Sequence, residues 1–197
     1  LSINSIDWFI THMAITAAGG IVLALDTNLS QKLHYQMFKK VDVRYVFVSP
    51  EFKKDYKELS VMDISLKENM LSPEKYKEPE IDESDLAALL YTSGTTGDPK
   101  IVSLTHRNLV KTSISMVNHL DIVPDDMVIA ILPLYHIYGL IANVFGPFAA
   151  GASIVFQPSL KGPDIIETLK NNRITIFPAV PQLWELFFDS IEKKVQN

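Results

Sequence analysis

The sequence predicts an α/β fold, in which a largely parallel sheet has helices on both of its faces. Two patterns lead to this prediction. Between residues 6 and 48, helical and strand-like segments alternate at the spacing of helices that connect parallel strands. Between Met127 and Leu160 there is no Lys, Arg, Asp or Glu, as expected for strands and helices buried on both faces of a sheet. A chain of 197 residues, 47% hydrophobic and 21% charged, is long and apolar enough for such a core.

The first part of the chain contains two helix–strand pairs. Residues 6–17 predict a helix that stops at Gly19-Gly20, and residues 21–25 predict the strand after it. Ser30 is expected to cap a helix over residues 31–40, and residues 43–48 predict the second strand. His12 and His34 fall within the helical patterns, and we interpret both as packing or surface residues.

A charged connector follows over residues 51–85. Lys and Glu dominate it, Pro73 and Pro79 interrupt it, and only residues 61–64 suggest a short strand. A charge run of this kind is typical of a solvated surface.

The most informative segment is a strand–turn–strand over residues 86–108. The apolar run 86–91 reads as a buried strand, and the segment after it is rich in hydroxyls and glycine. Glycines let the backbone approach a ligand, successive N–H groups can surround an anion, and a lysine adds a mobile positive charge. The segment is therefore a candidate polyphosphate site, with Thr92, Ser93, Gly94, Thr95, Thr96, Gly97 and Lys100 as its binding residues.

Two familiar phosphate loops do not fit this segment. The Walker loop needs four residues between its glycines and a lysine directly after the second, whereas Gly94 and Gly97 are three apart and Lys100 follows Asp98-Pro99. The glycine-rich loop of protein kinases needs a Gly-x-Gly start that is missing here. The remaining alternative is an ordinary Ser/Thr/Gly surface turn between two strands.

The second half continues the α/β pattern. Thr105 or Asn108 is expected to cap a helix that runs to about Leu120. Strands are predicted over residues 127–132, 152–156 and 174–177, and helices over residues 138–150 and 164–171, with a long helix at the end of the sequence. His136 follows the strand 127–132 at its carboxyl edge, where open α/β sheets bind ligands, although a histidine among apolar residues is more often a satisfied core group.

Two stretches of the sequence resemble those of the acyl-adenylate-forming enzymes, a family that includes acyl-CoA synthetases, peptide-synthetase adenylation domains and beetle luciferases. The first is Tyr-Thr-Ser-Gly-Thr-Thr-Gly-Asp-Pro-Lys at residues 91–100, followed by Val-Ser-Leu-Thr-His-Arg-Asn at 102–108. The second is Pro-Leu-Tyr-His-Ile-Tyr-Gly at residues 133–139. One departure is Ile101, where the family usually has glycine; we expect it to alter strand packing and not the chemistry.

The resemblance implies a part of the large N-terminal domain of an ATP-dependent carboxylate–CoA ligase, most similar to the long-chain fatty-acid type. Its substrates would be ATP, a carboxylic acid (in this branch a fatty acid) and CoA, with Mg²⁺ held mostly by residues outside this chain. Lys100 and His136 would be catalytic, and the acyl group would contact Tyr135, His136, Tyr138 and Gly139. The adenine motif and the C-terminal domain with its lysine have no counterpart in residues 1–197, so we expect the chain to be inactive by itself.

Several other functions are disfavoured. A net charge of −5 with a pI near 5.5 and no basic stripe argues against nucleic acid, and the lack of cysteine excludes disulfides and thiolate metal sites. A lone His136 without partners at ligand spacing predicts no metal site, and proline and glycine divide residues 127–160 too finely for a membrane span. We expect a cytoplasmic protein, with peripheral membrane association as the alternative. A peptide-synthetase adenylation domain, another adenylating ligase and a non-catalytic nucleotide-binding or scaffold module remain open.

Overall fold

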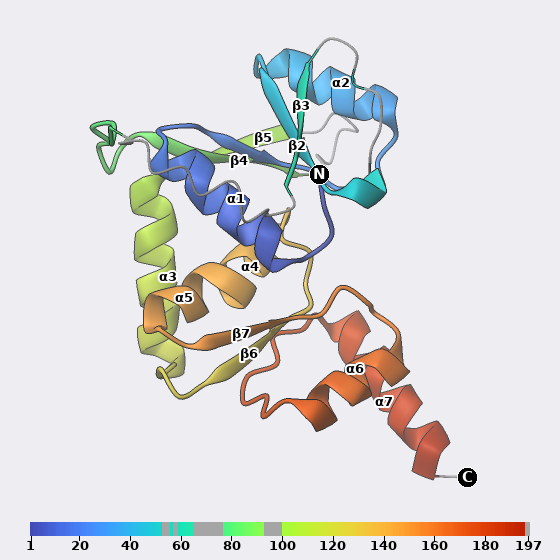
Figure 1. Ribbon diagram of the computed structural model, residues 1–197. Helices are drawn as coiled ribbons and strands as arrows, with labels where there is room; N and C mark the ends of the chain where they lie inside the picture. The colour runs from blue at the N-terminus through green and yellow to red at the C-terminus, as the bar shows by residue number, and fades with distance from the viewer. Residues whose placement is uncertain (53–55, 57–58, 65–76, 93–99, 196–197) are drawn as a thin grey trace. The chain divides into compact units, whose positions relative to one another are not determined.

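The computed structural model describes residues 1–52, 56, 59–64, 77–92 and 100–195. The chain divides into two compact units, Leu1–Arg107 and Asn108–Asn197, and each is described by itself. Both units contain helices and strands (Figure 1), and three of the four strand pairs are parallel. The α/β class and the mainly parallel pairing predicted from the sequence are confirmed.

The first unit has two sheets. Its elements are α1 (Ile6–Ala17), β1 (Val22–Ala24), α2 (Gln31–Lys40), β2 (Tyr45–Val48), the 3₁₀ helix η1 (Pro50–Phe52), β3 (Ser60–Asp63), β4 (Leu86–Thr92) and β5 (Lys100–Thr105). One sheet has the order β1-β4-β5, in which β4 runs parallel to β1 and antiparallel to β5; the other is the parallel pair β2-β3. α1 lies beside β1, and α2 lies beside β2 and β3 (Figure 1).

The main apolar core of this unit joins α2 to β2. Met37 and Phe38 of α2 pack with Val46 and Val48 of β2 around the buried Tyr56. Ser30 caps α2 as predicted, since its side chain accepts a hydrogen bond from the Leu33 N–H. The short strand predicted inside the charged connector is also present, as β3.

His12 and His34 are both buried, and neither lies among a group of residues that could bind a metal in the part of the chain that the structure describes. The His34 ring is 2.9 Å from the Tyr56 hydroxyl through Nδ1 and 2.9 Å from the Asp26 carbonyl oxygen through Nε2. His12 stacks on Trp8 with ring centroids 5.2 Å apart, and burial lowers the pKa of its imidazole to about 4. Both histidines are packing residues, as the sequence suggested.

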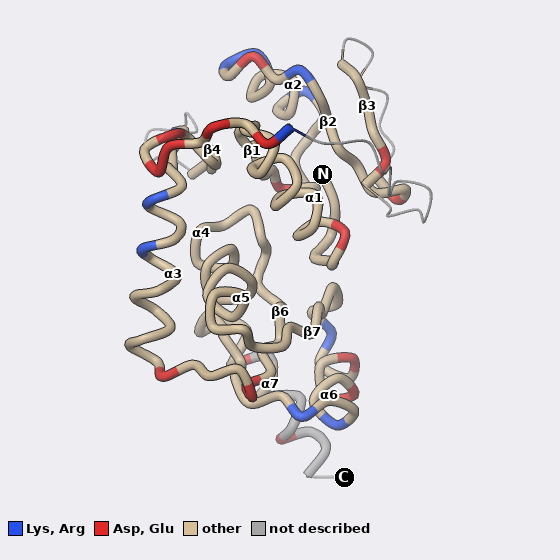
Figure 2. The backbone as a smooth tube through the Cα atoms, turned by 60° about the vertical axis from the view of Figure 1, so that its left-hand side comes forward, with Lys and Arg blue, Asp and Glu red and all other residues tan. Residues whose placement is uncertain are grey.

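The second unit is built on the parallel pair β6 (Met127–Ala130) and β7 (Ser153–Phe156). Its other elements are α3 (His106–Leu120, which begins at the end of the first unit), α4 (Ile137–Gly139), the π-helix η3 (Leu140–Phe145), α5 (Gly146–Ala150), α6 (Gly162–Asn171) and α7 (Pro181–Val195). The core contains Ile129 of β6, Ile165 of α6 and Leu183 of α7. Figure 2 shows that β6, α4, α5 and β7 contain no charged residue.

Two elements of this unit differ from the prediction. The helix expected over residues 138–150 contains a π-helical segment, Leu140–Phe145, between two short α-helices. The strand expected over residues 174–177 is reduced to one isolated bridge, between Ile176 and Val128. There the Thr175 side chain takes part in the pairing, because its hydroxyl accepts from the Met127 N–H and donates to Asp126.

Candidate functional site

The predicted polyphosphate segment closes a β-hairpin. β4 and β5 are antiparallel, with Thr92 directly opposite Lys100 in the pair next to the connecting residues. Both residues are exposed, so the Thr92 hydroxyl and the Lys100 ammonium stand on neighbouring strands at the mouth of the connection. The other predicted members, Ser93, Gly94, Thr95, Thr96 and Gly97, lie outside the described residues.

The hairpin is anchored through β4. This strand is central in its sheet, and Ala87, Ala88 and Leu90 are almost completely buried. Tyr91 packs against the core of the first unit, and burial raises the pKa of its hydroxyl, which therefore stays protonated. Ile101, the departure from the family pattern, is half-buried opposite Tyr91 within the strand pair. Thr92 and Lys100 thus emerge from a fixed, apolar base.

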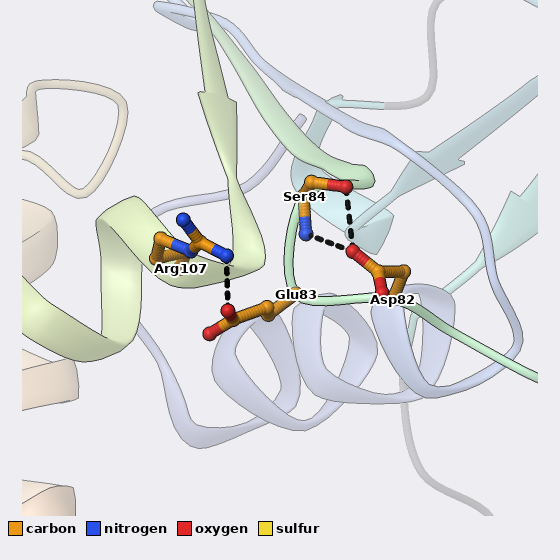
Figure 3. A network of polar contacts seen from close by, with 4 residues as sticks. All are labelled: Asp82, Glu83, Ser84 and Arg107. Carbon is orange, nitrogen blue, oxygen red and sulfur yellow. Dashed lines mark hydrogen bonds and ion pairs between the residues drawn. The ribbon is translucent and has the colours of Figure 1, made fainter.

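The opposite end of the hairpin is tied to the start of α3 (Figure 3). The Arg107 guanidinium forms an ion pair with Glu83, and the Arg107 N–H donates to the Glu83 carbonyl oxygen at 2.8 Å. The Ser84 hydroxyl and N–H both donate to the Asp82 carboxylate, and these bonds lower the pKa of Asp82. The segment before β4 and the first turn of α3 are thereby held together.

The predicted acyl-site residues lie in the second unit, in the turn after β6. The His136 N–H donates to the Pro133 carbonyl oxygen at 3.2 Å, and the His136 carbonyl oxygen accepts from Leu140 N–H at 2.8 Å. The backbone of His136 is extended (φ −100°, ψ 141°), so the residue lies just before α4. The Tyr135 and His136 rings are 4.5 Å apart, His136 and Tyr138 are exposed, and Tyr135 is half-buried. An exposed imidazole with aromatic neighbours is accessible to a ligand, unlike a satisfied core histidine.

Gly139 lies close to the backbone at the end of the preceding strand segment, and its predicted contact with the acyl group stays a prediction. It is buried, and a Cβ atom placed on it would lie 2.2 Å from the Pro133 carbonyl oxygen and 2.9 Å from the carbonyl carbon. Glycine therefore lets α4 meet the backbone at the end of the strand. Its contribution to the site is to set the position of the turn that includes His136.

Asn143 was not identified from the sequence. It is fully buried in the π-helix, and its Nδ2 donates to the Leu132 carbonyl oxygen at 2.8 Å. Its Oδ1 has no hydrogen-bond partner among the described residues. The sequence does contain a signal for it: an amide side chain inside a long uncharged run is expected to be buried, and a buried amide needs a hydrogen-bond partner. Asn143 and Gly139 together fix the turn that presents His136.

The predicted residues thus form two groups, one in each unit. Thr92 and Lys100 face each other on the hairpin, and Tyr135, His136, Tyr138 and Gly139 share one turn. Within the described ranges, no group of three or more His, Cys, Asp or Glu residues could hold a metal ion. No helix in the same ranges is long and apolar enough to cross a membrane.

Comparison with known proteins identifies the family. The family model described as "AMP-binding enzyme" matches residues 1–197. The chain is 24% identical to the long-chain-fatty-acid–CoA ligase ACSBG2 of Rattus norvegicus, over 99% of this chain and 34% of that protein. It is 29% identical to the 4-coumarate–CoA ligase-like 6 of Arabidopsis thaliana, over 91% of this chain and 36% of that protein.

Solved structures give the same result for the fold. The O-succinylbenzoate coenzyme A synthetase MenE of Bacillus subtilis, in complex with AMP, has a TM-score of 0.82 at 25% identity, covering 96% of this chain and 50% of that one. Apo MatB of Rhodopseudomonas palustris has a TM-score of 0.83 at 24% identity, covering 95% and 40%. The chain spans only about a third of the length of the two relatives named above. Because the family model covers all 197 residues, the chain belongs to the AMP-binding enzymes.

Proposed function

We propose that this chain is part of an ATP-dependent carboxylate–CoA ligase, and that the β4–β5 hairpin holds the β- and γ-phosphates of ATP. The observation that supports this most directly is the pairing of Thr92 with Lys100 on exposed ends of two anchored strands. A hydroxyl and an ammonium at the mouth of a glycine-rich connection suit a polyphosphate. Several of the relatives are named as CoA ligases.

The proposed reaction has two steps. An oxygen of the carboxylate attacks the α-phosphorus of ATP, the bond between that phosphorus and the bridging oxygen breaks, and pyrophosphate leaves with the bond electrons. The thiolate of CoA then attacks the acyl carbon, and AMP leaves. Lys100 would stabilise the negative charge that grows on pyrophosphate in the first step and would have no such charge to stabilise in the second.

The acyl group would lie against the turn of the second unit. His136 and Tyr138 are exposed there beside Tyr135, and β6, α4, η3, α5 and β7 contain no charged side chain. Apolar surroundings with an exposed imidazole favour an apolar acyl group over a charged one. We propose a fatty acid, in line with the printed name of the rat relative.

Magnesium usually accompanies ATP, and the family resemblance implies that most of its ligands lie outside residues 1–197. No group of three or more candidate ligands is present among the described residues. We therefore assign no metal ligand in this chain and derive no step from a metal ion.

The test compares the two half-reactions in a protein that contains this chain and the remaining length of its relatives. Lys100→Ala should slow adenylation by about 10²–10³, or about 2.7–4 kcal/mol, and should largely spare thioester formation from supplied acyl-AMP. Lys111→Ala is the matched control, because Lys111 is an exposed lysine of α3 that belongs to neither group of candidate residues. His136→Ala should instead give a loss that varies with the acyl chain offered.

Single-turnover measurement of both steps decides between the roles. Equal loss in the two half-reactions for Lys100→Ala would mean that the lysine supports the fold or the AMP moiety. Nucleotide binding without either half-reaction in the unsubstituted protein would favour a non-catalytic module. Transfer to a carrier protein instead of CoA would favour a peptide-synthetase adenylation domain.

A further inference from the structure

The π-helix η3 places one amide side chain in the uncharged core of the second unit. Asn143 is the only polar residue of Leu140–Phe145, and it is fully buried. Its Nδ2 donates to the Leu132 carbonyl oxygen at 2.8 Å. Its Oδ1 has no hydrogen-bond partner among the described residues. The hydrogen-bonding capacity of this buried amide is therefore only partly used.

A partly satisfied buried amide does not favour stability. A buried acceptor without a partner bears the full desolvation penalty, which an apolar side chain of similar shape would avoid. The surrounding segment is a π-helix, in which the Gly146 N–H donates to the Ile141 carbonyl oxygen five positions earlier. Such segments are rare and occur mostly at functional sites. Two features that stability does not favour thus coincide at Asn143.

The hydrogen bond of Asn143 lies where the chain leaves β6 and enters the turn with His136. Asn143 holds the carbonyl group of Leu132 at the start of this segment. At its other end, the His136 N–H donates to the Pro133 carbonyl oxygen at 3.2 Å, and the His136 carbonyl oxygen accepts from the Leu140 N–H at 2.8 Å. The segment from 132 to 140 is therefore held at both ends, and His136 lies between the two supports.

We propose that Asn143 is a positioning residue of the adenylation step, and that its amide is retained because it holds His136 in place for the acyl group. The inference rests on the proposed function, which gives His136 its contact with the acyl group. Asn143 itself contacts no reacting atom and acts through the Leu132 carbonyl group. Small displacements of a group that orients a substrate are sufficient to slow a reaction strongly.

The first test is a set of double-substitution cycles in the protein that contains this chain and the remaining length of its relatives. Leucine has the branching of asparagine but neither donor nor acceptor. Asn143→Leu should leave the urea midpoint unchanged or raised, and should slow single-turnover adenylation by at least about tenfold. In a His136→Ala background the same substitution should slow adenylation by less than about twofold, because the residue that it positions is missing. In a Lys100→Ala background its full effect should remain.

A purely structural role of Asn143 makes different predictions. It would lower the urea midpoint, and it would slow adenylation by the same factor in the unsubstituted, His136→Ala and Lys100→Ala backgrounds. Either result would overturn the proposal.

Asn143→Asp adds a conservative variant with a pH-dependent donor. A protonated carboxyl group can donate to the Leu132 carbonyl oxygen, whereas an ionised one cannot. The elements α4, α5 and β6, which pack on η3, contain no charged residue; Tyr138 is their only titratable group, and His136 directly precedes α4. Burial in these surroundings should raise the pKa of the new carboxyl group.

The adenylation rate of Asn143→Asp is therefore compared with that of the unsubstituted protein at each pH. The ratio should be close to one near pH 6 and should fall at least about tenfold by about pH 9, as the carboxyl group ionises. The ratio for Asn143→Leu should not vary with pH. If Asn143→Leu does not fold, this profile decides alone, and a flat ratio for Asn143→Asp would overturn the proposal.

Hydrogen exchange tests the support of the turn without any need for activity. Asn143→Leu should speed the exchange of the His136 and Leu140 amides at least about tenfold. The Gln157 amide, which donates to the Ala130 carbonyl oxygen between β7 and β6, should be unchanged. Unchanged exchange at His136 and Leu140 would overturn the positioning role whether or not the protein is a ligase. Faster exchange in a protein without ligase activity would instead refute the proposed reaction, and with it the role of Asn143 in adenylation.

Discussion

Gly139→Ala offers a sharp test of the turn that presents His136. The backbone of Gly139 is ordinary helix (φ −60°, ψ −42°), so alanine should gain about 1 kcal/mol from helix propensity alone. The structure predicts the opposite sign. The new Cβ would lie 2.2 Å from the Pro133 carbonyl oxygen, 1.2 Å short of the 3.4 Å at which ordinary contact begins.

The obstacle is backbone, which cannot rotate away as a side chain can. The Pro133 carbonyl carbon, at 2.9 Å, and the Leu132 carbonyl oxygen, at 3.2 Å, close the same space. Overpacking of this kind costs about 1–3 kcal/mol, and a rigid neighbour places the cost at the upper end. After the propensity gain, we expect a net loss of about 2 kcal/mol in the free energy of unfolding.

Urea unfolding measures this loss, and Gly146→Ala is the matched control. Gly146 is also helical (φ −65°, ψ −56°), but the nearest obstacle to its Cβ is the Met116 methyl group, at 2.0 Å, and the nearest backbone atom is the Ile141 carbonyl oxygen, at 3.0 Å instead of 2.2 Å. The end of a methionine side chain moves at low cost, so Gly146→Ala should stay within about 1 kcal/mol of the unsubstituted chain. An unchanged or stabilised Gly139→Ala variant, or equal losses in both variants, would show that Gly139 does not serve close approach.

Two further predictions concern the buried polar groups of the first unit. Burial lowers the pKa of His12 to about 4, against about 6.5 in the unfolded chain, so on acidification the unfolded state binds a proton before the folded state does. The free energy of unfolding, measured with urea, should therefore fall by up to about 3 kcal/mol between about pH 6.5 and about pH 4. His12→Gln should flatten this part of the profile, and an unaltered profile would assign it to other groups. Tyr56→Phe removes the hydroxyl 2.9 Å from His34 Nδ1 and should cost about 1–3 kcal/mol, whereas no loss would mean that His34 finds another partner.

Local sequence patterns predicted the helices and strands that depend on local signals. α1 and α2 begin and end at the residues expected, because apolar periodicity, the Ser30 cap and the Gly19-Gly20 stop are all encoded nearby. The phosphate segment was predicted from composition and spacing, and the strands on either side of it are present as β4 and β5.

Features that depend on distant contacts were not predictable in this way. Residues 174–177 have the composition of a strand, yet Thr175 uses its side chain to bond Asp126 and Met127, and only Ile176 bridges to β6. The π-helix from Leu140 to Phe145 has no local signal in a uniformly apolar run. Its buried Asn143 bonds a carbonyl oxygen eleven positions earlier in the chain, a contact that periodicity does not encode.

The two groups of candidate residues share one structural reason for their positions. Thr92 ends β4, which runs parallel to β1, and His136 follows β6, which runs parallel to β7. Ligands of open α/β folds bind outside the carboxyl ends of such strands, where the backbone leaves the sheet and side chains become accessible. In each unit an uncharged, buried strand ends at that edge. A contact between residues distant in the sequence holds the structure beside it: the Glu83–Arg107 ion pair at the base of the hairpin, and the hydrogen bond of the Asn143 amide behind the His136 turn. The chemistry expected at each edge therefore depends also on Glu83 and Asn143, which lie outside the two motif stretches.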